Sequence, residues 1–425
     1  MATVHDHKCP HHAAADGAPV RLDPRGGDVH GEAAHLRGQG LAARVELPGG
    51  VVAWSVGHHA VVRGLLGDKR VSKDPRQHWT AFRNGEIPAD WSLMSWVGVQ
   101  NMFTAYGSDH RRLRTLVSQA FTPRRTERLG PRIAELTAGL LDDLEAAHAA
   151  RPGPVDLREG FAYPLPIAVI CELYGVPEGD RDILRTSVDG LFSTSKSPEE
   201  AEAHMATLMR VMCDLVAGKR EKPGEDLTTA LIAARDADGS RLSEQELLDT
   251  LFLMIGAGHE TTVNLLHHAI RNLVENPGQL ARIRAGECSW DSAVEESLRH
   301  QPPIANLPLR YAVEDIELDD GTVIRAGEAI LVNYAGAGRD PEHHGSDADV
   351  FDVERPTRTD HLSFGHGVHF CVGAPLARLE GRIALPALFE RFPGLALAED
   401  ARNDTATESF IANGRQALMM RLRSR

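Results

Sequence analysis

The chain has 425 residues, of which 42% are hydrophobic and 25% charged, and its formal net charge is −14. This length is sufficient for one large domain or two to three ordinary ones, with a substantial core and a buried cofactor. The acidic balance argues against a nucleic acid as partner, and no run of Lys or Arg suggests attachment to an anionic membrane, which leaves small molecules and proteins.

The number and spacing of the cysteines and the length of the apolar runs indicate the cellular compartment of the protein. The five cysteines are odd in number and widely spaced, which fits a reducing cytoplasm better than a disulfide framework. The longest apolar runs are far shorter than the ~20 residues that span a bilayer, and the N-terminus lacks the core of a signal peptide. We therefore expect a soluble cytoplasmic protein.

Residues 1–18 are polar and rich in histidine, so this segment superficially resembles a metal-binding tract. A disordered tail is the preferred interpretation, because no periodic pattern would hold the ligands in one geometry. The remaining residues, 19–425, contain no evident repeat or linker and are expected to form a single domain. The potential ligands in the tail are His5, His7, Cys9, His11 and His12.

A small sheet is predicted to begin near residue 43. Two alternating segments within residues 43–56 flank the Pro-Gly-Gly sequence of residues 48–50, which is a hairpin signal, and residues 58–66 read as a short helix. Residues 91–103 are apolar without a clean period. They form either a loop that covers a pocket or ordinary core.

A histidine and an arginine mark the next helix. His110 and Arg114 stand four residues apart and so share one helix face, where two donor side chains can hold a carboxylate. The alternative is a solvated basic face, which is commoner for such a spacing. From residue 131 to 234 the pattern is repeatedly helical.

A long helix follows. Ser243 and Glu246 form a capping box, and apolar spacing continues to Asn276, which predicts about 30 residues or roughly 50 Å of helix. Gly256 and Gly258 lie in its middle, where each costs about 1 kcal/mol relative to Ala, so another group is expected to press against the helix there. Small side chains would admit a flat macrocycle, and threonine hydroxyls can bond back to a carbonyl.

The region after this helix carries two arginines of interest. Arg299 forms an i,i+3 pair with Glu296 in a predicted helix over residues 290–300, which is generically a surface ion pair. Residues 309–318 and 322–333 alternate around Asp-Asp-Gly, which predicts a hairpin with Arg310 on a strand. An isolated arginine on a strand is more often simply solvated.

The segment from Phe364 to Gly373 places Cys371 among glycines, just before a predicted helix over residues 374–391. A helix N-terminus stabilises a thiolate and lowers the pKa of a thiol. A lone thiolate suits haem iron, whereas structural zinc normally requires four clustered ligands. Without further context, a small buried apolar cysteine is the commoner case.

Phe364, Gly367, Cys371 and Gly373 match the pattern Phe-x-x-Gly-x-x-x-Cys-x-Gly, which resembles the haem-ligand loop of the cytochrome P450 family. Three further segments resemble that family in the same order along the chain, so the resemblance spans residues 20–425. They are the His110-x-x-x-Arg114 pair, the stretch that carries Ala257, Gly258, Glu260 and Thr261, and the Glu296-x-x-Arg299 element, with Arg355 as its third member and a structural role.

The resemblance implies a mainly α-helical fold with a minor β-region, and haem b clamped between the long helix and the Cys371 loop. Cys371 would be the axial ligand of the haem iron, while Glu260 and Thr261 would deliver protons to dioxygen. The residues implied to contact the haem are His110, Arg114, Ala257, Gly258, Thr261, Arg310, Phe364, Gly365, His369, Cys371 and Gly373.

The implied activity is hydroxylation of an unactivated C–H bond in a bulky apolar substrate with O2. Electrons would come from a ferredoxin and its reductase, because the chain has no flavin or nicotinamide motif. A steroid is the preferred substrate and a macrolide or other polyketide the alternative, ahead of a peroxygenase or a non-enzymatic haem sensor. The residues expected to line the substrate pocket are Trp91, Met94, Trp96, Leu191, Phe192, Ala257, Ile304, Phe410 and Ile411.

Overall fold

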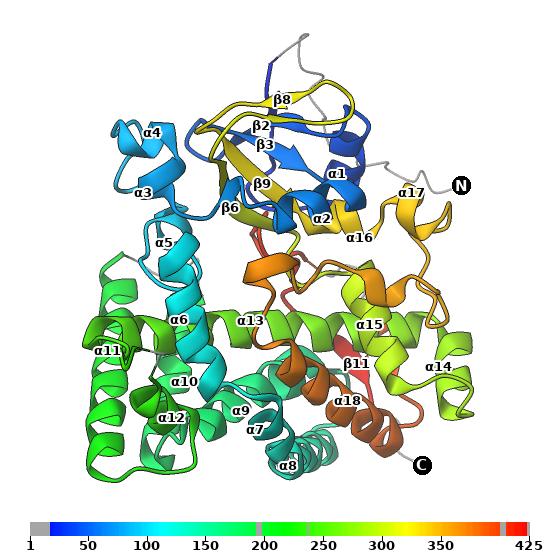
Figure 1. Cartoon of the computed structure of the whole chain (residues 1–425). Coiled ribbons are helices and arrows are strands. Elements are labelled where there is room, and N and C mark those ends of the chain that lie inside the picture. The colour runs from blue at the N-terminus through cyan, green and yellow to red at the C-terminus, as the bar shows by residue number, and fades with distance from the viewer. Residues whose placement is uncertain (1–17, 193–197, 236–237, 400–404, 423–425) are drawn as a thin grey trace.

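The computed structural model describes residues 18–192, 198–235, 238–399 and 405–422. Helices make up most of this part of the chain, and the strands of the main sheet gather at one end (Figure 1). The predicted mainly α-helical fold with a minor β-region is confirmed. Residues 1–17 of the expected tail lie outside the described residues, so its disorder stays a prediction. Within the described ranges, no helix combines the length and the apolar character that crossing a bilayer requires.

The main sheet confirms the first predicted hairpin. Its strands, in spatial order, are β1 (Val20–Arg21), β2 (Ala43–Leu47), β3 (Val51–Val56), β9 (Ala329–Asn333), β6 (Asn306–Ala312) and β4 (Val71–Ser72). β2 and β3 pair antiparallel, with residues 43–47 opposite residues 51–55. Their turn requires glycine, because Gly49 and Gly50 have φ values of +83° and +79°.

The second predicted hairpin is also present, but its pairing is divided into two parts. β6 and β9 pair within the main sheet, whereas β7 (Ile316–Glu317) and β8 (Val323–Ile324) pair separately. The register shifts between Leu307 and Arg310, where Pro308 has no N–H to donate to the ladder. Arg310 lies on a strand as predicted, but it is buried rather than solvated.

The long helix α13 runs from Glu244 to Glu275 and crosses the helical part of the molecule (Figure 1). Its capping box is present: Ser243 Oγ accepts from the amide of Glu246 at 3.2 Å, and Glu246 Oε2 accepts from the amide of Ser243 at 2.8 Å. Among the helices that pack against α13 are α9 (Pro164–Tyr174), α15 (Trp290–His300) and α18 (Ala374–Arg391). Helices far apart in the sequence therefore share one support.

A buried ion pair fastens α15 to a later segment. The side chains of Glu296 and Arg299 are both 0% exposed, and two bonds of 2.7 Å join the guanidinium to the carboxylate. Arg299 also donates to carbonyl oxygens within residues 338–350. Arg355 Nε lies 3.6 Å from Glu296 Oε1. The generic surface ion pair is thus excluded, and the geometry supports a structural role for this group.

Replacing Arg299 by lysine should destabilise the fold strongly, because lysine lacks the planar fork and leaves Glu296 buried with fewer donors. We expect the free energy of unfolding in urea to fall by about 3 kcal/mol or more. Arg282→Lys is the matched control, since Arg282 and its partner Glu354 are 39% and 46% exposed. Loss of such an exposed pair should cost less than about 1 kcal/mol. Equal effects of the two substitutions would contradict a structural role for the buried pair.

Candidate active site

One cavity brings together several helices, a strand and the Cys371 loop; we call it the central cavity. Every residue that was expected to contact a haem lines it. These residues are His110 and Arg114 on α6 (Gly107–Ala120), Ala257, Gly258 and Thr261 on α13, Arg310 on β6, and Phe364, Gly365, His369, Cys371 and Gly373 in the loop. The fold thus assembles one site from segments that are far apart in the sequence.

Glycine shapes the loop that carries Cys371. Gly365 and Gly367 have φ values of +73° and +70°, a conformation that residues with a side chain rarely adopt. A Cβ atom on Gly367 would also lie 2.6 Å from the carbonyl oxygen of Leu66. The amide of Cys371 donates to the carbonyl of Phe364 at 2.8 Å and closes the loop. These constraints fix the position of the sulfur.

The Cys371 side chain is open to the central cavity, while protein surrounds it closely elsewhere. Burial raises the pKa of the thiol, and the amides of Gly373 and Ala374 and the charge of Arg114 oppose this rise. The expected lowering of the thiol pKa at a helix N-terminus is therefore outweighed by desolvation. A metal ion on the sulfur would reverse this balance, because a coordinating thiol is deprotonated outright.

Five basic side chains line the central cavity; this basic cluster consists of Lys73, His110, Arg114, Arg310 and His369. His110 Nε2, Arg310 Nε and Lys73 Nζ are buried and have no hydrogen-bond partner among the residues that the structure describes. The rings of His110 and His369 lie 4.0 Å apart. Burial, followed by the charges of Arg114 and Arg310, lowers the pKa of His110 to about 4. Such a cluster matches a ligand that brings carboxylates.

Glu380 is the acidic residue among those that line the central cavity. It is 2% exposed, and burial raises its pKa to about 8. Glu380 is therefore predominantly protonated at neutral pH and carries little charge to neutralise the basic cluster.

Lys73 is a candidate site residue that the sequence did not reveal. It follows β4, is 2% exposed, and its Nζ lies 3.5 Å from the ring centroid of Phe103. Burial, followed by the charge of Arg310, lowers the pKa of its ammonium group well below the usual value. In the sequence Lys73 is a single lysine beside Asp74, which is typical of a solvated turn. Only tertiary packing turns it inward.

Thr261 and Glu260 face different surroundings. Thr261 lines the central cavity, and its Oγ1 donates to the carbonyl of Ala257 at 2.6 Å, as predicted for a threonine that bonds back along the helix. Glu260 is not among the lining residues, and its carboxylate lies 3.8 Å from the guanidinium of Arg158. Burial raises the pKa of Glu260, against the influence of Arg158 and Asn264. The structure therefore does not bring the acid and the alcohol together in the cavity.

The expected substrate pocket is only partly supported. Ala257 and Ile304 line the central cavity. Trp91 instead donates from Nε1 to the carbonyl of Pro48 at 2.6 Å and packs against Trp79 beside the main sheet. The other expected residues that belong to this sheet core, and not to the cavity lining, are Met94, Trp96, Phe410 and Ile411. Leu191 and Phe192 end α10 (Glu178–Phe192), and their side chains lie outside the described residues.

Apolar residues that were not anticipated line the central cavity instead, and the sequence pattern could have identified two of them. Leu253 and Met254 precede Ala257 by four and three residues and therefore share its helix face. Extending the helix face of Ala257 by one turn toward the N-terminus of α13 would have identified Leu253 and Met254. The lining residues that were not anticipated include Phe103, Ile170, Leu173, Leu253, Met254 and Leu307.

Comparison with known proteins identifies the class. The chain matches the cytochrome P450 family over residues 194–286 and 290–417. It is 46% identical over 407 residues to 2-hydroxy-5-methyl-1-naphthoate 7-hydroxylase of Streptomyces carzinostaticus, covering 96% of this chain and 98% of the relative. It is 39% identical over 374 residues to 6-deoxyerythronolide B hydroxylase of Saccharopolyspora erythraea, covering 87% and 90%. Testosterone-bound CYP154C4 from Streptomyces sp. ATCC 11861 superposes with a TM-score of 0.88 at 44% identity, covering 96% and 99%.

The chain therefore belongs to the cytochrome P450 family. It is a cytochrome P450 monooxygenase of the bacterial, Streptomyces-type group, and its cofactor is haem b bound through a cysteine thiolate.

The residues of the central cavity fit haem b. Cys371 would provide the thiolate for the iron, and the basic cluster would provide donors for the propionates. The small side chains of Ala257 and Gly258 would leave room for the haem on the face of α13. When bound, the haem supplies the activation of dioxygen and the hydroxylation itself. The chain contributes binding, orientation and an apolar surface that excludes water, and the Thr261 hydroxyl can hold a proton inside the cavity.

Replacing Arg310 by methionine should accelerate haem loss, because the variant removes a buried donor from the basic cluster while roughly preserving side-chain volume. We expect transfer of haem to an excess of apomyoglobin to become at least about 10-fold faster, which corresponds to about 1.4 kcal/mol. Arg325→Met is the control, since the Arg325 side chain is 66% exposed and pairs with Asp315 outside the cavity. Unchanged haem loss in the Arg310 variant would exclude a role in holding the cofactor.

Proposed function

We propose that this protein hydroxylates an unactivated C–H bond in a polyketide-type ring compound, aromatic or macrocyclic, with O2 and with electrons from a ferredoxin and its reductase. The observation that carries the proposal is the apolar lining around Thr261, made of Phe103, Ile170, Leu173 and Met254 among others. Such a surface binds a large ring compound by removing both from water.

The relatives support this substrate class over the steroid that the sequence favoured. The naphthoate hydroxylase is named for a fused aromatic acid, and the deoxyerythronolide hydroxylase for a macrocycle. The preference for a steroid was based on a mostly apolar set of residues, of which Ile304 lines the central cavity. Four of the seven residues concerned, Trp91, Met94, Trp96 and Phe410, do not line it. A steroid remains the second candidate, because the chain superposes closely on a cytochrome P450 that binds testosterone.

Electron delivery by a separate protein is supported by the lack of flavin and nicotinamide motifs in the sequence. Arg111 and Arg112 lie between His110 and Arg114 on α6, and an outward-facing arginine could contact an acidic redox partner. Arg111 is exposed on α6, whereas Arg112 forms an ion pair with Glu246. Arg111 is therefore the better placed of the two to meet a ferredoxin.

A spectral titration of the ferric enzyme should distinguish the substrate classes. An apolar ligand that displaces water from the haem iron shifts the absorption spectrum, so 2-hydroxy-5-methyl-1-naphthoate, 6-deoxyerythronolide B and testosterone can be compared directly. We expect one of the two polyketide-type compounds to bind at least about 10-fold more tightly than testosterone, a difference of about 1.4 kcal/mol. Tighter binding of testosterone would establish the steroid as the better substrate class.

Thr261→Ala should uncouple electron consumption from product formation, because it removes the hydroxyl that can hold a proton in the cavity. With a ferredoxin system and a bound substrate, product formed per NAD(P)H consumed should fall by about 10-fold or more. Thr250→Ala is a matched control on the same helix: Thr250 Oγ1 also bonds back, to the Glu246 carbonyl at 2.6 Å, but Thr250 does not line the cavity. Coupling that survives in the Thr261 variant would remove the proposed role.

A further inference from the structure

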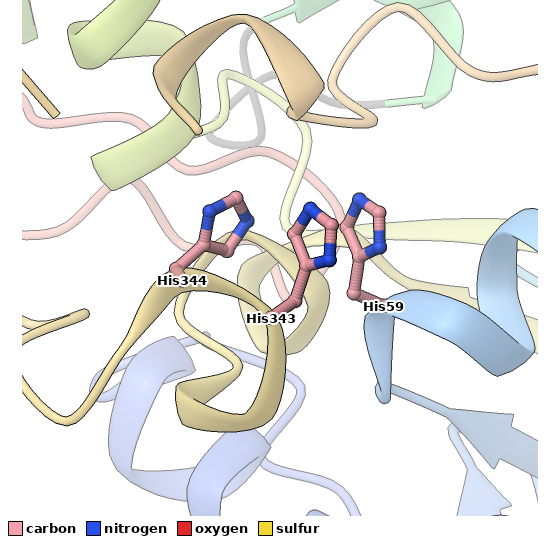
Figure 2. A group of neighbouring side chains, drawn as sticks. All are labelled: His59, His343 and His344. Atoms are coloured by element: carbon pink, nitrogen blue, oxygen red, sulfur yellow. The ribbon is translucent and has the colours of Figure 1, made fainter. Parts of the chain in front are cut away.

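Three histidines gather outside the central cavity, on two helices that are far apart in the sequence. His59 begins α2 (His59–Gly67), and His343 and His344 end α17 (Pro341–His344). One ring nitrogen from each lies within 4.8 Å of the others. Figure 2 shows the rings of His59 and His343 side by side, with His344 next to them.

Burial and hydrogen bonding leave these imidazoles with ring nitrogens to offer. His59 and His344 are 3% and 4% exposed. His59 Nε2 lies 2.9 Å from the carbonyl of Asp360, to which it can only donate, so Nδ1 keeps its lone pair in the neutral ring. Nδ1 of His344 bonds to Thr357 Oγ1 at 2.9 Å, and Nε2 of His344 is buried without a partner. Metal-binding histidines are commonly oriented by such a bond on the opposite nitrogen.

The protonation state of the His59 and His344 imidazoles is compatible with binding of a metal cation. Burial lowers the pKa of His59 and lowers that of His344 to about 2, so both imidazoles are neutral at physiological pH. Asp360 Oδ2 lies 3.4 Å from His343 Nε2, which itself makes no hydrogen bond. A carboxylate is thus close enough to balance part of a divalent charge.

The arrangement of the three imidazole rings shows how they would have to move to bind one metal ion. His59 and His343 are stacked, with centroids 3.6 Å apart and planes 5° from parallel, whereas His344 is nearly perpendicular to both. Ligand nitrogens about 2.0–2.1 Å from a tetrahedral ion lie roughly 3.4 Å apart, so the separations between the three nitrogens, which are within 4.8 Å, must shorten by at most about 1.4 Å. The His343 side chain is 33% exposed and has the room to turn away from the stack.

We propose that His59, His343 and His344 bind a divalent transition-metal ion, Zn²⁺ in the first instance, with Asp360 or water as the fourth ligand. Neutral imidazole nitrogens select ions of the zinc, nickel and copper type over Mg²⁺ and Ca²⁺, which prefer oxygen ligands. A bound ion would join α2 to the segment that precedes the Cys371 loop. This site lies apart from the haem iron and does not depend on the substrate proposed above.

Zinc binding to the full-length, haem-loaded enzyme tests the site. After removal of metals with a chelator, Zn²⁺ should be titrated against a chromogenic competitor. His343→Gln/His344→Gln should lose one equivalent of binding or weaken it at least 10-fold. The control is His11→Gln/His12→Gln, another adjacent histidine pair in the N-terminal segment, which should keep that equivalent. X-ray absorption at the zinc edge, measured on the zinc-loaded His11→Gln/His12→Gln variant, should show three imidazole nitrogens at about 2.0–2.1 Å from the zinc. The haem iron does not interfere at this edge.

His343→Gln alone addresses the possibility that the double variant misfolds, because this ring is the most exposed of the three. Its haem spectrum should match that of the unchanged protein, while its melting temperature should no longer rise on addition of Zn²⁺. Zinc binding of unchanged stoichiometry and affinity in both variants would overturn the proposal. Loss of all zinc binding in the His11/His12 control would also overturn it and assign the metal to the N-terminal segment.

Discussion

Buried basic side chains without hydrogen-bond partners at the central cavity are the constraint on which the rest of the structure depends. Lys73, His110 and Arg310 each have a polar atom that is buried without a partner, and such groups are costly to bury unless a ligand satisfies them. Because an anionic cofactor satisfies them only in the folded state, its binding also stabilises the fold by linkage. The basic cluster would therefore connect folding to cofactor loading, and the Cys371 loop would be the other attachment point.

The long helix α13 also lines the central cavity, and its sequence leaves space there for a ligand. α13 is held by its capping box and by the helices packed along it, so it tolerates small residues where a ligand must approach. A Cβ atom on Gly258 would meet Ile170 only at 3.5 Å, an ordinary contact, so no neighbouring side chain requires a glycine there. The small residues at 257 and 258 instead keep the cavity face of the helix open for the cofactor.

Local sequence signals predicted the helices and the first hairpin, because caps, periodicity and turn residues lie in consecutive positions. The residues expected to contact the haem came instead from the resemblance to the cytochrome P450 family, and the structure places them around one cavity. Contacts between distant segments were not predictable in this way. Lys73 turns inward only through tertiary packing, and Trp91 bonds to Pro48 instead of lining the pocket. The pairing of Glu260 with Arg158 depends on a neighbouring segment that no spacing rule identifies.

Phe103 belongs to the apolar lining of the central cavity and also contacts the basic cluster. Phe103 lines the central cavity, and its ring covers the buried ammonium of Lys73 at 3.5 Å. An aromatic ring stabilises a desolvated cation that lacks another partner. A smaller side chain at this position would enlarge the apolar pocket and at the same time weaken the environment of the basic cluster. The apolar lining and the basic cluster are therefore in direct contact, so a substitution in one would alter the surroundings of the other.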